Sequence, residues 1–231
     1  FNNKKYLVES LESFDPQTAQ IIIFSAGSTV AEKYARDFVA AGSFVVDLSS
    51  NFRYQDDVPL IIPEINGDII ESLSKPSLIA NPNCSTAQLL MALKPIHDNA
   101  KIKFLNIAIY QAVSGTGKAA LEELHNQTYF KDSENESVVY PKQIAFNVIP
   151  QCDIFLENNF TKEEMKLTWE THKILDSSIR IQATCVRVPV YNGHSEAVFF
   201  KVSKDMSREE IITLLEDSAG IKVLDDPKEG L

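Results

Sequence analysis

Two short apolar runs separated by a helical pattern constrain the fold of this chain more than any other feature. The runs are QIIIF (20–24) and FVVDLSS (44–50), and each has the length and composition of a buried strand. The segment between them carries apolar residues at spacings of three and four: Val30, Tyr34, Phe38 and Ala41. Strand, helix and strand at this separation predict a βαβ unit with a parallel sheet, and SLIA (77–80) is expected to add a strand to it.

The chain after about residue 83 has longer strand patterns and a different arrangement of helices. We expect these elements there: a strand at KIKFLNIAIY (101–110), a helix at 118–129, an acidic loop at KDSENES (131–137) and a last helix at SREEIITLLEDS (207–218). The change predicts an α/β fold class with two domains. A parallel α/β domain over residues 1–82 is followed by a mixed sheet with helices on one side over residues 83–231.

The stretch from 161 to 203 adds a capped helix and two strands. TKEE (161–164) is a capping-box sequence, and the helix that it starts is expected to reach about Leu175. Three residues form the expected apolar side of this helix: Met165, Trp169 and His172. IRIQATCVRVPV (179–190) and SEAVFFKVS (195–203) are two strand patterns, and the Asn-Gly between them suggests a tight reversal.

Composition excludes several classes of function. The chain has 22 Lys and Arg against 32 Asp and Glu, a formal net charge of -10, and no basic run, so nucleic acid and anionic membranes are poor partners. No apolar run approaches the roughly 20 residues that cross a bilayer, and no secretory signal is visible. The three cysteines are far apart and form no CxxC pair, so we expect a reduced, cytoplasmic setting.

NPNCST (81–86) places Cys84 between a strand-like and a helix-like run. The first-turn N–H groups and the dipole of a helix starting there would favour a thiolate. The Asn83 amide is expected to be able to hydrogen-bond an oxyanion. Cys84 is therefore a candidate nucleophile. The alternative, about equally favoured by this segment alone, is a small buried hydrophobe at a helix start.

A thiol nucleophile needs a proton partner. Three of the four histidines lie in helical patterns and are more typical of packing or surface residues: His97, His125 and His172. His194 follows a glycine at a strand junction, where it could project into a cleft or simply be a turn histidine. Arg187 lies within an apolar strand, on the face of Ala183 and Cys185, so it is either part of a structural ion pair or an anion site.

QAVSGTGKA (111–119) supplies small residues between a strand and a helix. Gly115 and Gly117 would let the backbone approach a ligand closely. The full G-x-G-x-x-G dinucleotide fingerprint is absent from the sequence. The turn alone is therefore weak evidence for a cofactor.

Several segments, taken in order, resemble one family: the bacterial aspartate-β-semialdehyde dehydrogenases. The segments are FSAGSTVAEKYA, VVDLSSNFR, VPLIIPEIN, ANPNCSTAQLLMAL, YQAVSGTGKAALEEL, IPQCDIFLENNFTKEEMKLTWETHKIL and VRVPVYNGHSEAVFF. They span nearly the whole chain. The resemblance implies that 1–82 is a partial Rossmann-like nucleotide-binding domain and that 83–231 is a catalytic and dimerisation domain, in a homodimer or a dimer of dimers.

The resemblance also implies a role for individual residues. Cys84 resembles the nucleophile that forms an acyl-thioester, His194 the acid/base, and Gln111 the residue that orients the substrate. The implied substrate-binding residues are Arg187 and Glu163 for the carboxylate and amino group, Arg53 and Lys166 for the phosphate, and Asn83 beside the cleft. The implied NADP pocket includes Ser25, Ala26, Gly27, Ser114 and Gly115. Without the resemblance, Glu163 and Lys166 would be an ordinary exposed helix pair and Arg53 a solvated loop charge.

The implied reaction is the NADPH-dependent reductive dephosphorylation of β-aspartyl phosphate to aspartate semialdehyde. It serves the biosynthesis of lysine (through diaminopimelate), methionine, threonine and isoleucine. The family also has a glycine-rich cofactor loop and a closing helix that these 231 residues lack. We therefore expect the chain to be part of a longer enzyme, and a chain without that loop to bind NADP poorly.

Two other functions are compatible with the sequence. The acetylglutamyl-phosphate reductases use a similar Cys/His chemistry on a related substrate, although YQAVSGTGKAALEE and GHSE favour the aspartate enzyme. A non-catalytic assembly module is the other alternative, because long strands leave a sheet face to cover.

Overall fold

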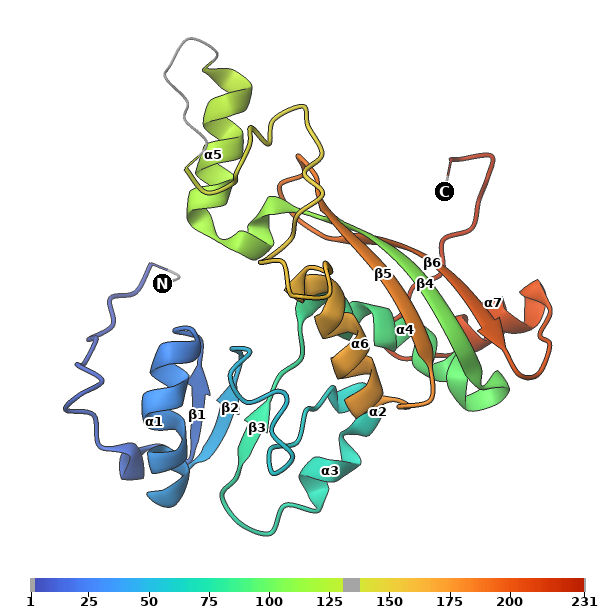
Figure 1. The fold of residues 1–231 in the computed structure, drawn as a ribbon. Helices are drawn as coiled ribbons and strands as arrows, with labels where there is room; N and C mark the ends of the chain where they lie inside the picture. Colours follow the sequence, from blue (N-terminus) through green and yellow to red (C-terminus); the bar gives the residue numbers. More distant parts are fainter. Residues whose placement is uncertain (1–2, 131–137, 231) are drawn as a thin grey trace. The chain divides into compact units, whose positions relative to one another are not determined.

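The computed structural model describes residues 3–130 and 138–230, so the predicted acidic loop KDSENES lies outside the described residues. The chain divides into two compact units, whose elements are labelled in Figure 1. The first unit is Phe1–Ile61 with Gly67–Pro82, and the second is Ile62–Asn66 with Asn83–Leu231. The chain therefore enters the second unit once, for five residues, before the predicted boundary at 82/83.

A three-stranded parallel sheet forms the centre of the first unit. Its strands, in sheet order, are β1 (Ile21–Phe24), β2 (Phe44–Asp47) and β3 (Leu78–Ala80). The helical elements of this unit are η1 (Pro16–Thr18), α1 (Ser28–Ala40) and α3 (Asp68–Glu71). Helix α1 connects β1 to β2, so the predicted βαβ unit and its parallel sheet are confirmed.

The second strand ends three residues earlier than predicted. The Asp47 carboxylate accepts hydrogen bonds from the Ser49 main-chain N–H (2.9 Å) and the Ser49 hydroxyl (2.8 Å). An aspartate that bonds the backbone two residues ahead turns the chain out of the extended conformation. The polar DLSS sequence therefore forms a turn at the carboxyl end of β2.

A mixed sheet forms the centre of the second unit. Its strands, in sheet order, are β5 (Arg180–Arg187), β4 (Ile102–Gln111) and β6 (Ser195–Val202). Strand β5 is parallel to β4 and β6 is antiparallel to it. The predicted tight reversal between β5 and β6 is wrong, because β4 lies between these two strands. The Asn192-Gly193 junction instead carries the chain past the end of β4.

The helical elements of the second unit are α2 (Pro63–Asn66), α4 (Cys84–Ala100), η2 (Val113–Thr116), α5 (Lys118–Tyr129), α6 (Lys162–Ile174) and α7 (Arg208–Glu216). Helices α4, α6 and α7 lie on one face of the mixed sheet (Figure 1), and their side chains share a core with it. Leu105, Ile107 and Ile109 of β4 point into that core and are fully buried. The opposite face is open, and Phe199 on it is 70% exposed. Among the described residues, no helix is both long and apolar enough to span a membrane.

Helix α6 begins at the predicted capping box. The Thr161 hydroxyl accepts from the Glu164 N–H (3.3 Å), and the Glu164 carboxylate accepts from the Thr161 N–H (2.7 Å). The predicted apolar side of α6 is wrong, because Trp169 is 37% exposed. The buried side carries Glu163, Leu167, Glu170, Thr171 and Ile174. Carboxylates with hydrogen-bond partners thus replace apolar residues on it, a pattern that hydrophobic periodicity alone does not detect.

We predict that Thr161→Ala lowers the free energy of unfolding by about 1 kcal/mol, because it leaves the Glu164 N–H without its cap. Urea unfolding followed by circular dichroism measures the change. Thr168→Ala, in the middle of the same helix, is the matched control and should be neutral or slightly stabilising. Equal losses in the two variants would contradict the capping role.

Candidate functional site

The amino end of α4 is held by its own cap and by α6. The Asn83 side-chain oxygen accepts from the Ser85 N–H at 2.8 Å, and the Asn83 N–H donates to Glu170 at 2.6 Å. Cys84, the first residue of the helix, is exposed, whereas Cys152 and Cys185 are buried. The buried-hydrophobe interpretation of Cys84 is therefore wrong, and the thiol is accessible at a helix N-terminus.

The mixed sheet brings three polar side chains to the end of α4. The buried face of β4 ends in Gln111, and the buried face of β5 ends in Arg187. The two residues are partners in the parallel ladder, so their side chains lie next to each other on the same face. His194 directly precedes β6, which runs antiparallel to β4 from this end of the sheet.

Cys84 and His194 are in contact. The Cys84 sulfur lies 3.3 Å from His194 Nε2, and His194 Nδ1 accepts a hydrogen bond from the Ala112 N–H at 3.0 Å. The other histidines contact structural partners. His97 Nδ1 accepts from the Ile102 N–H at 3.2 Å, and His172 Nε2 lies 2.7 Å from the Ile179 carbonyl oxygen. His194 is thus the histidine that the fold brings to the exposed thiol.

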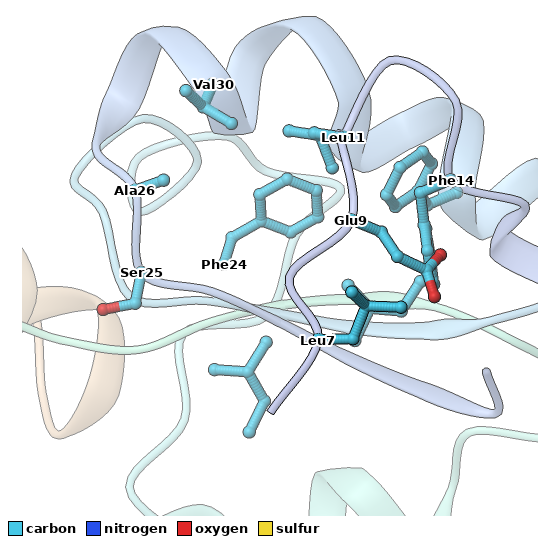
Figure 2. A pocket seen from close by; sticks show the side chains of 11 residues that line it. Leu7, Glu9, Leu11, Phe14, Phe24, Ser25, Ala26 and Val30 are labelled. Carbon is cyan, nitrogen blue, oxygen red and sulfur yellow. The ribbon is translucent and has the colours of Figure 1, made fainter. Parts of the chain in front are cut away.

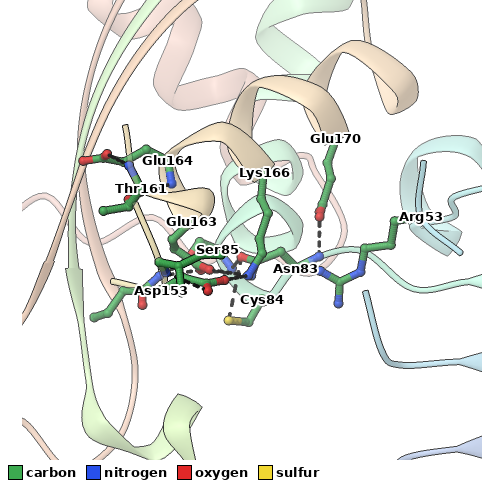
Figure 3. A network of polar contacts seen from close by, with 12 residues as sticks. Arg53, Asn83, Cys84, Ser85, Asp153, Thr161, Glu163, Glu164, Lys166 and Glu170 are labelled. Carbon is green, nitrogen blue, oxygen red and sulfur yellow. Dashed lines mark hydrogen bonds and ion pairs between the residues drawn. The ribbon is translucent and has the colours of Figure 1, made fainter. Parts of the chain in front are cut away.

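Glu163 is the centre of a polar network beside Cys84 (Figure 3). Its carboxylate accepts from Asn83 Nδ2 (2.9 Å), Gln111 Nε2 (2.7 Å) and Lys166 Nζ (2.8 Å). Lys166 also contacts Asp153 at 2.7 Å. The side chains of Glu163 and Lys166 are only 9% and 12% exposed, so the exposed-pair interpretation is wrong. Burial raises the cost of leaving either charge without its partner.

The network fixes the orientation of two amides. A carboxylate only accepts, so the NH₂ groups of Asn83 and Gln111 must face Glu163. Gln111 Nε2 also donates to the Ser85 hydroxyl at 3.1 Å. The oxygen of Asn83 lies on the side of the Cys84 sulfur, at 3.9 Å. Asn83 therefore caps the helix through its oxygen and spends one of its two amide hydrogens on Glu163, and the prediction that this amide donates to an oxyanion stays a prediction.

Arg187 is a buried guanidinium, 8% exposed, without a carboxylate partner among the described residues. Its Nη1 donates to the Ala112 carbonyl at 2.8 Å, and its Cζ lies 5.7 Å from the centroid of the Tyr140 ring. Its Nε is buried and has no hydrogen-bond partner in the described structure. Because a buried charge needs a counterion, these contacts favour an anion site over a structural ion pair.

The charges around Cys84 shift its pKa and that of its neighbours. Although the Cys84 side chain is accessible, the protein around its sulfur displaces water, and this desolvation and the negative charge of Glu163 raise the pKa of Cys84 against the opposing effect of the Ser85 N–H. Burial and the Arg187 guanidinium lower the pKa of His194, with Glu163 opposing. Burial alone would raise the pKa of Glu163, but Lys166 and the amide donors outweigh it and lower this pKa. Near neutral pH the site therefore contains a neutral imidazole and an ionised Glu163.

Ser114 and Gly115, which the resemblance assigns to the cofactor, also lie in the second unit. A Cβ built on Gly115 would lie 3.2 Å from His194 Cε1 and 3.3 Å from His194 Nε2, so the absence of a side chain there leaves room for the imidazole. Ser114 is held by its main chain, because its N–H donates to the Tyr191 carbonyl at 3.1 Å.

The remaining predicted residues belong to the first unit. Arg53 is 6% exposed, and its Nε donates to the Asn81 carbonyl at 2.8 Å, so it is not a solvated loop charge. Ser25 and Ala26 line a cavity of about 420 Å³ whose other walls are mostly apolar (Figure 2). Gly27 has φ of +86° and is the N-cap of α1, with no side-chain cap hydrogen bond.

Sequence reasoning missed three residues that hold the site together: Ala112, Asp153 and Glu170. Glu170 lies seven positions after Glu163, two helical turns along the same side of α6, so a search for paired acidic residues would have found it. Ala112 acts through its main chain and leaves no signal in the sequence. No group of three or more His, Cys, Asp or Glu side chains among the described residues is arranged to hold a metal ion.

Comparison with known proteins identifies similar chains. The family model for the NAD binding domain of semialdehyde dehydrogenases matches residues 2–73, and that for their dimerisation domain matches residues 93–231. The aspartate-semialdehyde dehydrogenase of Shewanella violacea is 47% identical over 99% of this chain and 69% of its own length. Aspartate-semialdehyde dehydrogenase 2 of Vibrio cholerae is 45% identical, over 96% of this chain and 67% of its own length.

Solved structures agree with these matches. The Vibrio cholerae aspartate semialdehyde dehydrogenase II complexed with ASA superposes with a TM-score of 0.91 at 45% identity, covering 95% of this chain and 66% of that one. The Candida albicans enzyme with NADP has a TM-score of 0.64 at 26% identity, covering 85% of this chain and 55% of that one. The chain thus spans about two thirds of the length of its bacterial relatives.

We predict that iodoacetamide labels Cys84 in the folded protein and labels Cys152 and Cys185 only after unfolding, because only the first thiol is exposed. Peptide mass spectrometry after brief labelling measures the extent of labelling at each cysteine, and Cys84 should be labelled more than about 10-fold faster than the other two. Equal labelling of Cys84 and Cys152 in the native protein would contradict the site. Cys84→Ser is the control and should remove the native signal.

The pH dependence of this labelling tests the electrostatics. The rate should rise with a midpoint above the ordinary thiol pKa, because burial and Glu163 raise the pKa of Cys84. Glu163→Gln removes a negative charge and should move the midpoint to lower pH. Glu196→Gln, in β6, is the control and should leave the midpoint unchanged. A midpoint that moves to higher pH in Glu163→Gln would contradict the conclusion that the Glu163 charge raises the pKa of Cys84.

Proposed function

The chain belongs to the aspartate-semialdehyde dehydrogenase family, and we propose that it contains the nucleophile and substrate site of an NADP-dependent enzyme. This enzyme would reductively dephosphorylate β-aspartyl phosphate to aspartate semialdehyde. One observation carries the proposal: an exposed thiol at a helix N-terminus lies 3.3 Å from a histidine. A buried arginine without a counterion among the described residues belongs to the same unit.

The Cys84 thiolate attacks the acyl carbon of the substrate, and the phosphate leaves with the electrons of the broken C–O bond. The product of this step is an acyl-thioester on Cys84. The N–H of Ser85 and the dipole of α4 stabilise the thiolate. A thiolate suits both halves of the reaction, because it is a strong nucleophile in the first and a good leaving group in the second.

Arg187 binds the α-carboxylate of the substrate. The planar guanidinium of Arg187, with its Nε unpartnered in the described structure, fits a bidentate contact with a carboxylate. Arg187 pairs with Gln111 in the ladder, so a carboxylate bound there lies close to the Gln111 amide that orients the substrate. A substrate without this carboxylate would leave the arginine buried and unpaired, which supports selectivity for an amino-acid substrate.

Glu163 and Lys166 exchange partners when the substrate binds. Lys166 Nζ now lies 2.8 Å from Glu163 and 2.7 Å from Asp153. The substrate ammonium takes the place of Lys166 at Glu163, and Lys166 is then free to contact the phosphate. Arg53, in the first unit, is the other residue proposed for the phosphate. The exchange keeps Glu163 paired with a cation throughout, which burial of this carboxylate requires. Asn83 holds Cys84 in position as the helix cap.

Each unit, taken by itself, contains residues that we propose for a dinucleotide cofactor. The amino end of α1 lacks a side-chain cap, and no atom lies within 4 Å of a Cβ built on Gly27, so main-chain N–H groups there can receive a phosphate. Ser25, Ala26 and Gly27 in the first unit, and Ser114 and Gly115 in the second, are the proposed contacts. When bound, NADPH supplies the hydride that reduces the Cys84 thioester.

The second unit forms a homodimer, or part of a dimer of dimers, through the open face of its mixed sheet. Phe199 and Tyr110 on that face are 70% and 44% exposed. An uncovered sheet face with exposed aromatic side chains is typical of a subunit interface. The family model that matches this unit describes a dimerisation domain, which supports a second copy of the chain as the occupant.

The proposed setting is the cytoplasm, where the three thiols stay reduced, and the proposed pathways are those to lysine (through diaminopimelate), methionine, threonine and isoleucine. All three cysteines are free in the described structure, in agreement with this setting.

We predict that Cys84→Ser lowers turnover about 10³-fold or more while the far-ultraviolet circular dichroism stays unchanged. The assay is phosphate-dependent NADPH formation from aspartate semialdehyde, the reverse of the proposed reaction. Retained activity would refute the nucleophile. Faster turnover on the semialdehyde of N-acetylglutamate than on aspartate semialdehyde would favour the acetylglutamyl-phosphate reductase alternative. Absence of turnover in a longer enzyme that also contains the glycine-rich cofactor loop would favour an assembly module.

The same assay tests the carboxylate site. Arg187→Lys should raise KM about 10-fold or more, because lysine cannot form the bidentate contact. Arg180→Lys, at the exposed start of the same strand, is the matched control and should change KM little. An unchanged KM in Arg187→Lys would contradict the assignment.

We predict that Phe199→Glu converts the dimer to a monomer, because it places two buried charges at the centre of the proposed interface. Sedimentation velocity measures the oligomeric state. Leu224→Glu, at a position that is 57% exposed outside the sheet, is the control and should leave the dimer intact. A dimer that persists in Phe199→Glu would place the interface elsewhere.

A further inference from the structure

Two buried side chains of α5 hold the chain segment that contains Tyr140. The Glu123 carboxylate accepts hydrogen bonds from the main-chain N–H groups of residues 138–139, at 2.9 and 2.6 Å. The Gln127 side-chain oxygen accepts from the N–H groups of residues 144–145, at 2.9 and 3.1 Å. The backbone on both sides of Tyr140 is therefore fixed to α5, and burial of the acceptors strengthens these hydrogen bonds.

Tyr140 is the residue that this segment places against Arg187. Its side chain is buried and belongs to an apolar cluster with Val113 and Ile144. Its hydroxyl donates to the Thr116 hydroxyl at 2.9 Å. The centroid of its ring lies 5.7 Å from Arg187 Cζ, within the range of a cation–π interaction. The ring is thus held at its polar tip and along its apolar body, so it offers the guanidinium a fixed surface.

The Tyr140 ring stabilises the cation without acting as its counterion. Burial raises the pKa of Tyr140, against the opposing effects of the Thr116 hydrogen bond and the Arg187 charge, so the phenol is neutral at neutral pH. A carboxylate in its place would occupy the guanidinium fork, and the substrate would have to displace it. The ring and the Ala112 carbonyl, at 2.8 Å from Nη1, instead leave the Arg187 Nε without a partner in the described structure.

The main chain of Arg187 is held by the same part of the chain. The Ile149 N–H donates to the Arg187 carbonyl at 2.9 Å, and the Arg187 N–H donates to the Ile149 carbonyl at 2.8 Å. Ile149 belongs to the same apolar cluster as Tyr140. The segment from 138 to 149 therefore fixes both the backbone and the side chain of the arginine.

We propose that Tyr140 is a positioning residue, whose ring holds the Arg187 guanidinium in the orientation that receives the α-carboxylate of the substrate. Tyr140 thereby contributes to the selectivity for an amino-acid substrate. This inference deepens the proposed function and rests on it for the identity of the substrate. Both residues belong to the second unit, so the arrangement depends only on contacts within that unit.

The first test removes the ring and compares the two substrates of the reverse reaction. In a longer enzyme that also contains the cofactor loop, Tyr140→Leu should raise KM for aspartate semialdehyde about 10-fold. KM for phosphate and kcat should stay within about twofold, because Arg187 is proposed to bind only the carboxylate. Tyr140→Phe keeps the ring and should stay close to the unsubstituted enzyme. Tyr129→Leu, at the exposed end of α5, is the matched control and should change neither KM.

The second test asks whether the ring acts through the arginine. Arg187→Met removes the cation but keeps a long side chain. Tyr140→Leu should lower kcat/KM for aspartate semialdehyde about 10-fold alone, but less than about twofold when Arg187→Met is already present. Losses that multiply, or equal increases in both KM values in Tyr140→Leu, would overturn the proposal, because they indicate a structural role. If Tyr140→Leu does not fold, Tyr140→Met fills the same space with a flexible apolar side chain and takes its place.

The third test needs no turnover and separates this inference from the proposed function. L-Aspartate has the carboxylate and ammonium groups of the proposed substrate, so it should protect Cys84 from iodoacetamide. The L-aspartate concentration that halves the labelling rate should rise about 10-fold in Tyr140→Leu and stay unchanged in Tyr140→Phe. Equal protection of Tyr140→Leu and the unsubstituted protein would overturn this inference alone. No protection of the unsubstituted protein would overturn the carboxylate site itself, and this inference with it.

Discussion

The buried carboxylate of Glu163 is the interaction on which the rest of the site depends. It accepts hydrogen bonds from the residue that caps α4, from the last residue of β4 and from a lysine one turn along its own helix. Three elements that are distant in the sequence are thus tied to one pair of oxygens. Replacing such a hub by a neutral group would leave several buried donors unsatisfied, which is more costly than the loss of one hydrogen bond.

This arrangement has an electrostatic cost that the site offsets elsewhere. The negative charge of Glu163 raises the pKa of the Cys84 thiol and so works against the nucleophile. The Ser85 N–H at the start of α4 acts in the opposite direction. The thiol is therefore accessible and well placed but is not permanently ionised, and an accessible thiol that is mostly protonated is less prone to oxidation.

Much of the fold could be predicted from the sequence, because local patterns determine it. The period of the apolar residues between 20 and 50 fixed the βαβ unit, and the capping box at Thr161 fixed the start of α6. The predictions failed where a distant element intervenes. The Asn-Gly at 192–193 looks like a hairpin turn, but β4, some 80 residues earlier in the chain, lies between the two strands. The buried side of α6 was missed because its carboxylates are satisfied by donors on other elements.

In the candidate site, too, some features can be predicted from the sequence and others cannot. Residues that act through a distinctive side chain, such as Cys84, Arg187 and His194, can be proposed from a family resemblance, and the second unit brings them to one end of its sheet. The orientation of each group cannot be proposed in that way, because it depends on which hydrogen-bond partners surround it. Asn83 has an amide suited to an oxyanion, and the structure shows that one of its amide hydrogens is used by Glu163 and its oxygen by the helix. Likewise, the Ala112 main-chain N–H that holds the His194 ring at Nδ1 leaves no signal in the sequence.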